Sequence, residues 1–277
     1  MRLRFAFLVA SLISPLGAGA SDVEQLEAEI APAFDGWTRY EDRTALAIDI
    51  LNRGADWEGK LLLLEGDFRL ERPLQLPSGS RKKVWMPVQL RSGGMEGFLH
   101  LESKGEKTLS TRYQLRALGP HDVLAVAVSD RGMFLSGLVR ATSPMGPGNI
   151  RVPFLNTQEL PSHPQAYGAV DALFAADWRP DALTSEQAQA LKSWVADGGL
   201  LVLSADPDPA KLRTEWLAPI LPARQGQDAE LKVLAALARH TGVPGDPRDP
   251  EPWSVRLEPA ADATVLLGSA QEPLAVL

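Results

Sequence analysis

Three aspartates are the residues of this sequence whose type and placement could do chemistry. Asp130, Asp177 and Asp206 each stand at or just past the end of an apolar run that predicts a parallel strand. Ligands of open parallel sheets bind beyond the carboxyl ends of the strands, near the point where the strand order reverses. Three carboxylates converging there could hold Mg²⁺ or Ca²⁺, which prefer oxygen ligands. The alternative is that each aspartate caps a following helix or turn.

Ser204 is the candidate nucleophile, because it ends one of these strands. In α/β enzymes a nucleophile at this place sits in a strained turn between glycines, which leave room beside it. Here the neighbours are Leu203 and Ala205, and the nearest histidine along the chain, His240, falls in a predicted helix. A serine without an activating base is a poor nucleophile. We therefore predict no catalytic residue and no enzyme activity.

The elements that must position these side chains lie after residue 120. Apolar strands are predicted at 122–130, 149–155, 170–177 and 200–204, with late strands at 253–259 and 263–269. Helices are predicted around 132–140, from Thr184 to the Gly198-Gly199 stop, and over 228–242. Thr184 and Gln187 form a capping-box pattern. This strand–helix alternation predicts a parallel sheet in a doubly wound α/β fold.

Residues 37–118 have a period of two instead. Leu46, Ile48 and Ile50 alternate with their neighbours, as do the apolar residues of 84–90 and 113–117. Such alternation buries one face of a strand. Short strands separated by turn signals predict an antiparallel β-sandwich.

Two resemblances extend these predictions. "LERPLQLPSGSRKKVWMPVQL" resembles a stretch of bacterial immunoglobulin-like modules. "VLAVAVSD", "ELPSHPQAYGAVDALFAAD" and "LTSEQAQALKSWVADGGLLVLSAD" resemble the class I glutamine amidotransferase-like fold, a flavodoxin-like fold, in its non-catalytic form in bacterial envelope proteins. The matching residues are Leu160-Pro161, Tyr167, Asp171, Leu183-Thr184, Gln187, Trp194-Val195 and Gly198-Gly199. The resemblance implies an immunoglobulin-like sandwich followed by this α/β domain, acting through envelope protein partners.

The N-terminus has the pattern of a signal peptide. Arg2 and Arg4 precede a short apolar run, and Ala18-Gly19-Ala20 supplies the small residues at a cleavage site. We expect export, to the periplasm or the outer face of the cytoplasmic membrane. No later segment is apolar for long enough to span a membrane. The chain stops inside a predicted strand, so we expect it to be truncated, with any membrane helix beyond Leu277.

The composition excludes several classes of function. The formal net charge is −7, and the longest basic cluster is Arg81-Lys82-Lys83, which argues against nucleic-acid binding. The absence of cysteine excludes disulfides, thiol nucleophiles and zinc–thiolate sites. The four histidines lack zinc-ligand spacing, and the Gly/Pro-rich stretch 143–149 lacks a phosphate-loop pattern. We predict no cofactor.

These observations predict a signal peptide in 1–20, a β-sandwich in 21–119 and an α/β domain in 120–277. The leading hypothesis is a non-catalytic exported envelope protein that acts through protein–protein interactions. One alternative is an enzyme or ligand binder that depends on a divalent metal at Asp130, Asp177 and Asp206. Another is a glycan-binding sandwich, suggested by seven tryptophans and by Trp85 on a predicted strand.

Overall fold

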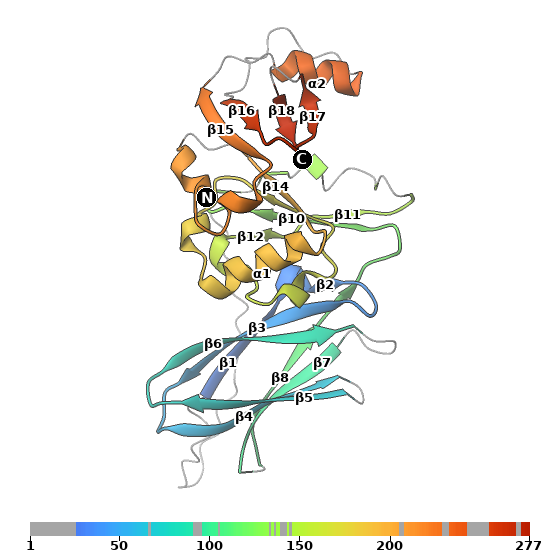
Figure 1. Cartoon of the computed structure of the whole chain (residues 1–277). Helices are drawn as coiled ribbons and strands as arrows, with labels where there is room; N and C mark the ends of the chain where they lie inside the picture. Colours follow the sequence, from blue (N-terminus) through green and yellow to red (C-terminus); the bar gives the residue numbers. More distant parts are fainter. Residues whose placement is uncertain are drawn as a thin grey trace.

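The computed structural model contains an antiparallel β-sandwich, then a parallel sheet, then a group of short antiparallel strands (Figure 1). The structure describes residues 26–65, 68–90, 96–104, 106–132, 134–135, 137–138, 143, 146–204, 208–228, 233–242, 255–269 and 273–277. The predicted signal peptide therefore lies outside the described residues. In the part of the chain that is described, no helix has the length and apolar character needed to cross a membrane.

The predicted β-sandwich is confirmed. A three-stranded sheet has the order β1-β3-β6, and a four-stranded sheet has the order β5-β4-β7-β8, with every pair antiparallel. The strands are β1 (Leu26–Pro32), β3 (Arg43–Asn52), β4 (Trp57–Glu65), β5 (Phe68–Leu76), β6 (Arg81–Gln89), β7 (Glu96–Ser103) and β8 (Glu106–Gln114). A short parallel pair, β2 (Trp37–Thr38) and β9 (Arg116–Ala117), lies where the sandwich meets the rest of the chain.

The alternation seen in the sequence fills the sandwich core. Leu46, Ile48 and Ile50 on β3 are fully buried, and the apolar residues of β6 lie opposite them in the same core. Side chains that alternate along a strand point to opposite faces of the sheet, so each strand contributes every second residue. All members of this core, which we call the sandwich core, come from residues 26–117.

The parallel sheet predicted after residue 120 is also present. Its order is β11-β10-β13-β14, with β12 also paired to β10, and all pairs are parallel. The strands are β10 (Val123–Val128), β11 (Ile150–Arg151), β12 (Phe154–Leu155), β13 (Ala172–Ala175) and β14 (Leu200–Leu203). The single strand predicted at 149–155 is split in two, because Pro153 cannot donate to the sheet. β10 is buried on both faces, as its apolar run predicts.

Helix α1 (Ser185–Ala196) begins and ends as predicted. Thr184 and Gln187 form the reciprocal capping box. Gly198 has a φ of +100°, which suits the end of a helix, and Gly199 lets the Trp194 ring pack where a Cβ would stand. Leu191 and Trp194 then join α1 to the second hydrophobic core.

Helices on both faces of the sheet, as a doubly wound fold requires, are not found in the described residues. Between β12 and β13 the chain makes only the 3₁₀ turns η4 (Thr157–Glu159) and η5 (Pro164–Tyr167). Pro161 and Pro164 prevent a longer helix there. The helix predicted around 132–140 lies largely outside the described residues.

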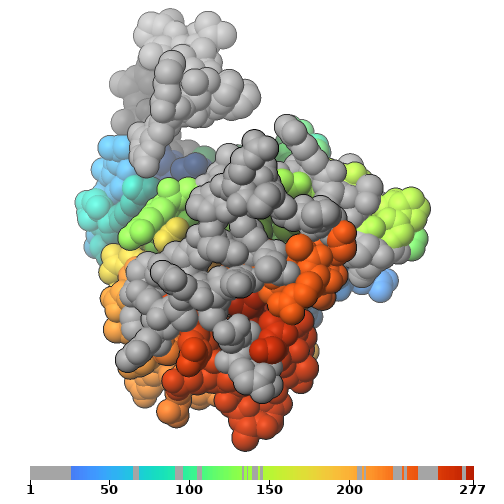
Figure 2. Space-filling view, turned by 90° about the horizontal axis from the view of Figure 1, so that it is seen from above, coloured from blue at the N-terminus to red at the C-terminus, as the bar shows by residue number. Residues whose placement is uncertain are grey.

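After β14 the strands become antiparallel. The chain forms the 3₁₀ turn η6 (Pro180–Ala182) just before α1. Two further 3₁₀ turns, η7 (Pro209–Leu212) and η8 (Ala218–Ile220), lie between β14 and β15. β15 (Ala223–Asp228) pairs with β16 (Val255–Pro259), and β17 (Val265–Gly268) pairs with β18 (Pro273–Val276). Helix α2 (Val233–Thr241) lies against β17. These elements confirm the predicted late helix and strands. Figure 2 shows their residues (orange to red) gathered at the end of the molecule opposite the sandwich.

The second core takes residues from both halves of the chain. Phe34, in the turn η2 (Ala33–Gly36), is 1% exposed and packs against Tyr167, whose ring in turn contacts Trp194. Phe34, Asp35 and Gly36 have φ values of +54°, +56° and +80°. Left-handed backbone is unfavourable for Phe and Asp, so burial of the Phe34 ring has to stabilise this turn. We call this cluster the joint core.

Candidate ligand pocket at the carboxyl edge of the parallel sheet

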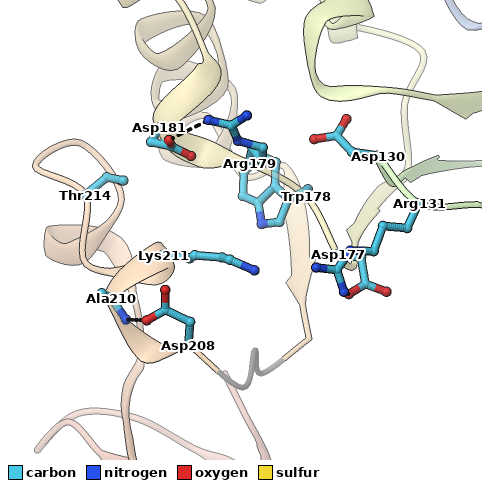
Figure 3. Close-up of a pocket in the computed structure, with 10 residues that line it drawn as sticks. All are labelled: Asp130, Arg131, Asp177, Trp178, Arg179, Asp181, Asp208, Ala210, Lys211 and Thr214. Carbon is cyan, nitrogen blue, oxygen red and sulfur yellow. Dashed lines mark hydrogen bonds and ion pairs between the residues drawn. The ribbon is translucent and has the colours of Figure 1, made fainter.

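A pocket of about 500 Å³ opens where β10 and β13 end (Figure 3). Parallel strands present their carboxyl ends at one edge of a sheet, and ligands bind there in open α/β sheets. The pocket is lined by Asp130, Arg131, Asp177, Trp178, Arg179, Asp181, Asp208, Ala210, Lys211 and Thr214. Seven of these ten side chains are charged.

Two of the three predicted aspartates meet here. Asp130 follows β10 and Asp177 follows β13, and the backbone N–H of Asp130 donates to the carbonyl of Asp177 at 3.2 Å. Both side chains line the pocket. Asp206 lies outside the described residues, so the predicted three-carboxylate cluster is described only as a pair.

The Asp130 carboxylate is engaged within the fold. One oxygen accepts from the backbone N–H of Thr157 and the other from the Thr157 hydroxyl, each at 2.8 Å. Thr157 begins the turn η4, so Asp130 satisfies an N–H that the turn leaves free. Asp130 thus holds the first N–H of η4, a turn whose N-cap residue is Asn156.

Asp177 is held differently. Its φ is +50°, a left-handed conformation that Asp tolerates better than most residues. One carboxylate oxygen lies 3.4 Å from an Arg131 guanidinium nitrogen, and both side chains are largely solvent-exposed. Asp177 therefore presents a carboxylate at the pocket mouth, close to a cation.

The opposite wall carries a second pair of charges. Arg179 donates to the Asp181 carboxylate at 3.1 Å, and this hydrogen bond lowers the pKa of Asp181. Asp208 caps η7 by accepting a hydrogen bond from the backbone N–H of Ala210 at 3.0 Å. Lys211 is the next residue of the same turn. Positive and negative groups thus alternate around the pocket.

Two uncharged polar atoms in the same wall have no hydrogen-bond partner in the described structure. They are the indole nitrogen of Trp178 and the hydroxyl of Thr214. Trp178 is 3% exposed, and its ring meets Trp216 edge to face at 6.1 Å, while the Trp216 N–H is bonded to the Pro180 carbonyl. A buried donor without an acceptor costs roughly 1–3 kcal/mol.

The described residues form no cluster of metal ligands, and Ser204 does not stand in a strained turn. They contain no group of three or more histidines or acidic residues placed to hold a metal ion. Ser204 is exposed, its N–H donates to the Ala175 carbonyl, and its φ is not in the left-handed region. Ser204 simply continues the ladder of β14.

The sequence reasoning missed Trp178, Arg179, Lys211 and Thr214. A signal existed: "DWRPD" places three charges directly after the buried strand β13, and "DPAKLRT" places three more soon after β14. Loops at strand carboxyl ends commonly carry binding residues. Which of these side chains meet depends on the strand order, which the sequence does not contain.

Trp85, which suggested glycan binding, lies where the sandwich packs against the joint core. Its side chain is half-buried and packs against the joint core, and the Lys83 ammonium lies 5.1 Å from its ring centre. A sugar-stacking residue needs an open ring face. Trp85 instead contributes to the contact between the sandwich and the rest of the chain.

A family model described as Domain of unknown function (DUF8726) matches residues 25–116, which is the sandwich. No curated protein matches the sequence. One similar solved structure is the Pseudomonas fluorescens alkylpurine DNA glycosylase AlkC bound to DNA containing an abasic site analog, with 12% identity and a TM-score of 0.26 over 34% of this chain and 31% of that one.

A second is a Paenibacillus sp. cycloisomaltooligosaccharide glucanotransferase complexed with cycloisomaltoheptaose, with 10% identity and a TM-score of 0.26 over 65% of this chain and 27% of that one. This chain spans less than a third of either protein. Similarity this low carries no inference about fold or function.

Proposed function

We propose that this protein is a non-catalytic, exported protein of the bacterial envelope that acts by binding other envelope proteins. In this proposal an immunoglobulin-like sandwich is followed by an amidotransferase-like α/β domain that has no reaction centre. The observation that carries it is Ser204, which leaves β14 with an ordinary backbone where an enzyme of this kind would hold a strained nucleophile.

The strand order supports the immunoglobulin-like part. Seven strands between residues 26 and 114 form sheets of three and four, and sequential strands cross from one sheet to the other after β3, β5 and β6. This two-sheet arrangement in about 100 residues is typical of immunoglobulin-like sandwiches.

The interlocking of the motif residues supports the amidotransferase-like part. The Tyr167 hydroxyl donates to the Pro161 carbonyl at 2.9 Å, and the Gln187 amide donates to the Leu160 carbonyl at 2.6 Å. The residues that carry the resemblance thus hold one another in place. They form a scaffold, which a protein can keep after its chemistry is lost.

The free edge of the parallel sheet supports a binding role. In the described structure β14 pairs only with β13, and Leu200 and Val202 are 42% and 36% exposed on one face. Exposed apolar residues on an unpaired edge strand favour association with another chain.

The test of non-catalysis compares the wild type with Ser204→Ala on glutamine, amide, peptide and ester substrates. We expect no turnover above the uncatalysed rate in either protein, since Ser204 has no activating base. Turnover by the wild type that disappears in Ser204→Ala would overturn the proposal.

The test of binding places a photo-cross-linking residue at Val202 in the producing bacterium, with exposed Gln189 on α1 as the matched control position. We expect one discrete adduct in the envelope fraction from position 202 and none from position 189. The adduct must disappear when Leu200→Asp is added. Recovery of the protein from the cytoplasm, or identical labelling at both positions, would contradict the proposal.

A further inference from the structure

The free side of β14 carries backbone groups that the described chain does not pair. The N–H of Ser204, directly after β14, donates to the carbonyl of Ala175 on β13 at 3.0 Å. Backbone groups alternate sides along a strand, so every second residue of β14 directs its groups to β13. The N–H and C=O groups of Leu201 and Leu203 therefore point to the opposite side, where no strand of the described residues pairs with β14.

Edges of the sandwich are protected against pairing, and the edge at β14 is not. The edge strand β6 carries Lys82, Lys83 and Pro87, and the edge strand β5 carries Arg72 and Pro73. Charged residues and prolines on an edge strand discourage pairing with another chain. The sequence of β14 is LLVL, which contains neither a charge nor a proline. The chain thus blocks these two edges and leaves β14 suited to pairing.

The side chains of β14 add an apolar strip to this edge. Leu201 and Leu203 pack against the joint core, together with residues of α1. Leu200 and Val202 lie on the opposite face of the sheet, with 42% and 36% of their surface exposed. Side chains of paired strands contact one another directly on each face. A strand added to β14 would therefore cover Leu200 and Val202 with every second one of its own side chains.

The outward backbone groups decide between a strand and a helix as the bound element. A helix lying on the open face could cover Leu200 and Val202. It could not bond the N–H and C=O groups of Leu201 and Leu203, because a helix uses its own backbone groups internally. An extended segment satisfies both the backbone groups and the apolar side chains.

We propose that the binding partner attaches to β14 by adding an extended segment to the parallel sheet as a further strand. This inference rests on the function proposed above and specifies the form of the contact. Main-chain hydrogen bonds to Leu201 and Leu203 hold the segment in place. Apolar side chains at alternate positions, beside Leu200 and Val202, determine which segment is preferred.

The first experiment measures the spacing of the partner residues along β14. A photo-cross-linking residue replaces Leu200 in one protein and Val202 in another, each as the full chain in the producing bacterium. Mass spectrometry of the adducts then locates the linked partner residues. An added strand should give sites two residues apart, because paired strands have nearly the same rise per residue. Sites three or four residues apart, the spacing of one helix face, would overturn the inference and leave the proposed function intact.

Two other outcomes would overturn the proposed function together with this inference. One is the absence of a discrete adduct from both positions. The other is an adduct with a second copy of this chain, which its mass and its peptides identify. The exposed position Gln189 on α1 is again the control, and the same adduct from that position would count as the first outcome.

The second experiment removes one outward N–H. Leu201→Pro deletes the N–H that faces the added strand, whereas Leu201→Ala shortens the same side chain and keeps the N–H. With the cross-linking residue at Val202, Leu201→Pro should give about tenfold less adduct than Leu201→Ala. Thermal melts establish that both variants are folded, and equal yields from the two folded proteins would overturn the inference. If Leu201→Pro does not fold, the spacing experiment decides, since it leaves Leu201 unchanged.

Discussion

The two hydrophobic cores of this protein are built in different ways. The sandwich core uses only residues 26–117, and the strands that line it pair with one another within that range. The joint core combines the parallel sheet and α1 with Ala33, Phe34 and Ala45 from the sandwich half. Trp37 and Trp85 also pack against it. The sandwich core is complete within its own half of the chain, whereas the joint core needs apolar residues from the sandwich half to be complete.

Polar contacts reinforce this dependence. Arg39 next to β2 donates to the Ala169 carbonyl at 2.6 Å, to the Asp122 carbonyl at 3.0 Å and to the Asp171 carboxylate at 2.6 Å. Asp171 also accepts from the backbone N–H of Leu124, at the start of β10. One arginine of the sandwich half thus ties together the two segments that lead into β10 and β13. The asymmetry between the cores leads to the predictions below.

Separating the halves should have the largest effect. We expect residues 21–118 to melt cooperatively alone, because the sandwich core is complete within them. Residues 119–277 should not, because the place of Phe34 becomes an open apolar cavity. Thermal denaturation followed by circular dichroism measures both. Cooperative melting of 119–277 alone would refute the asymmetry.

Phe34→Ala should destabilise the joint core by about 3–5 kcal/mol, the usual cost of removing a buried phenylalanine ring. Hydrogen exchange should rise in α1 and β13 and stay unchanged in β3 and β6. Phe98→Ala, at a side chain that is 47% exposed, is the control and should change little. Equal loss of protection in both cores would mean that they unfold as one unit.

Arg39→Ala should destabilise the contact between the sandwich and the parallel sheet by about 1–2 kcal/mol. This cost is smaller than that of breaking a fully buried charged network, because the Arg39 and Asp171 side chains are 26% and 30% exposed. Arg39→Lys should recover only part of this, since an ammonium cannot reach all three acceptors in a fork. Urea denaturation measures both variants, and full recovery by lysine would show that the charge alone matters.

Asp122 makes the start of the parallel sheet, before β10, sensitive to acid. Hydrogen bonds from the backbone N–H groups of Asn149 and Gly119, at 2.7 Å and 3.0 Å, lower its pKa below 3.8. A carboxyl whose pKa is lower in the folded state stabilises the fold above its unfolded pKa, and this stability is lost as the pH falls through the folded value.

Asp122→Asn should therefore cost about 1 kcal/mol or more at neutral pH, and the difference from wild type should close as the pH falls from about 4. Denaturation midpoints between pH 2 and pH 7 give the comparison. A difference that is the same at every pH would show that ionisation of Asp122 contributes nothing.

The smallest effect is expected at the sandwich surface. Arg53 and Glu27 form a well-oriented pair at 2.7 Å, but their side chains are 62% and 58% exposed. Exposed pairs of this kind contribute little. Arg53→Ala should leave the melting temperature unchanged within experimental error, in contrast to Arg39→Ala. A decrease in melting temperature as large as that of Arg39→Ala would show that this surface pair matters as much as the contacts of Arg39.

Local patterns in the sequence predicted most of the elements. The alternation in β3 and β6, the apolar run of β10 and the Thr184–Gln187 capping box each depend on residues within a few positions of one another. Strands β1, β4, β5 and β7 were not individually predicted. Unbroken runs such as Leu61–Leu64 do not have a clear period of two, although Leu61 and Leu63 enter the sandwich core.

The pocket and the joint could be predicted only in part. Asp130 and Asp177 were predicted to meet because parallel strands share a carboxyl edge. Phe34 was not predicted to leave its own domain, because the reason lies 133 residues later, at Tyr167. A left-handed phenylalanine is unfavourable locally, and only the distant aromatic contact makes it stable.

That separation also has a consequence in time. Arg39 and Asp171 are 132 residues apart, so at the usual speed of protein synthesis about 7–26 s pass between their appearances. During this interval the sandwich can close, while Phe34 and Arg39 still wait for their partners. The surface around η2 is therefore the part of a growing chain at which other proteins, including chaperones, have the longest opportunity to bind.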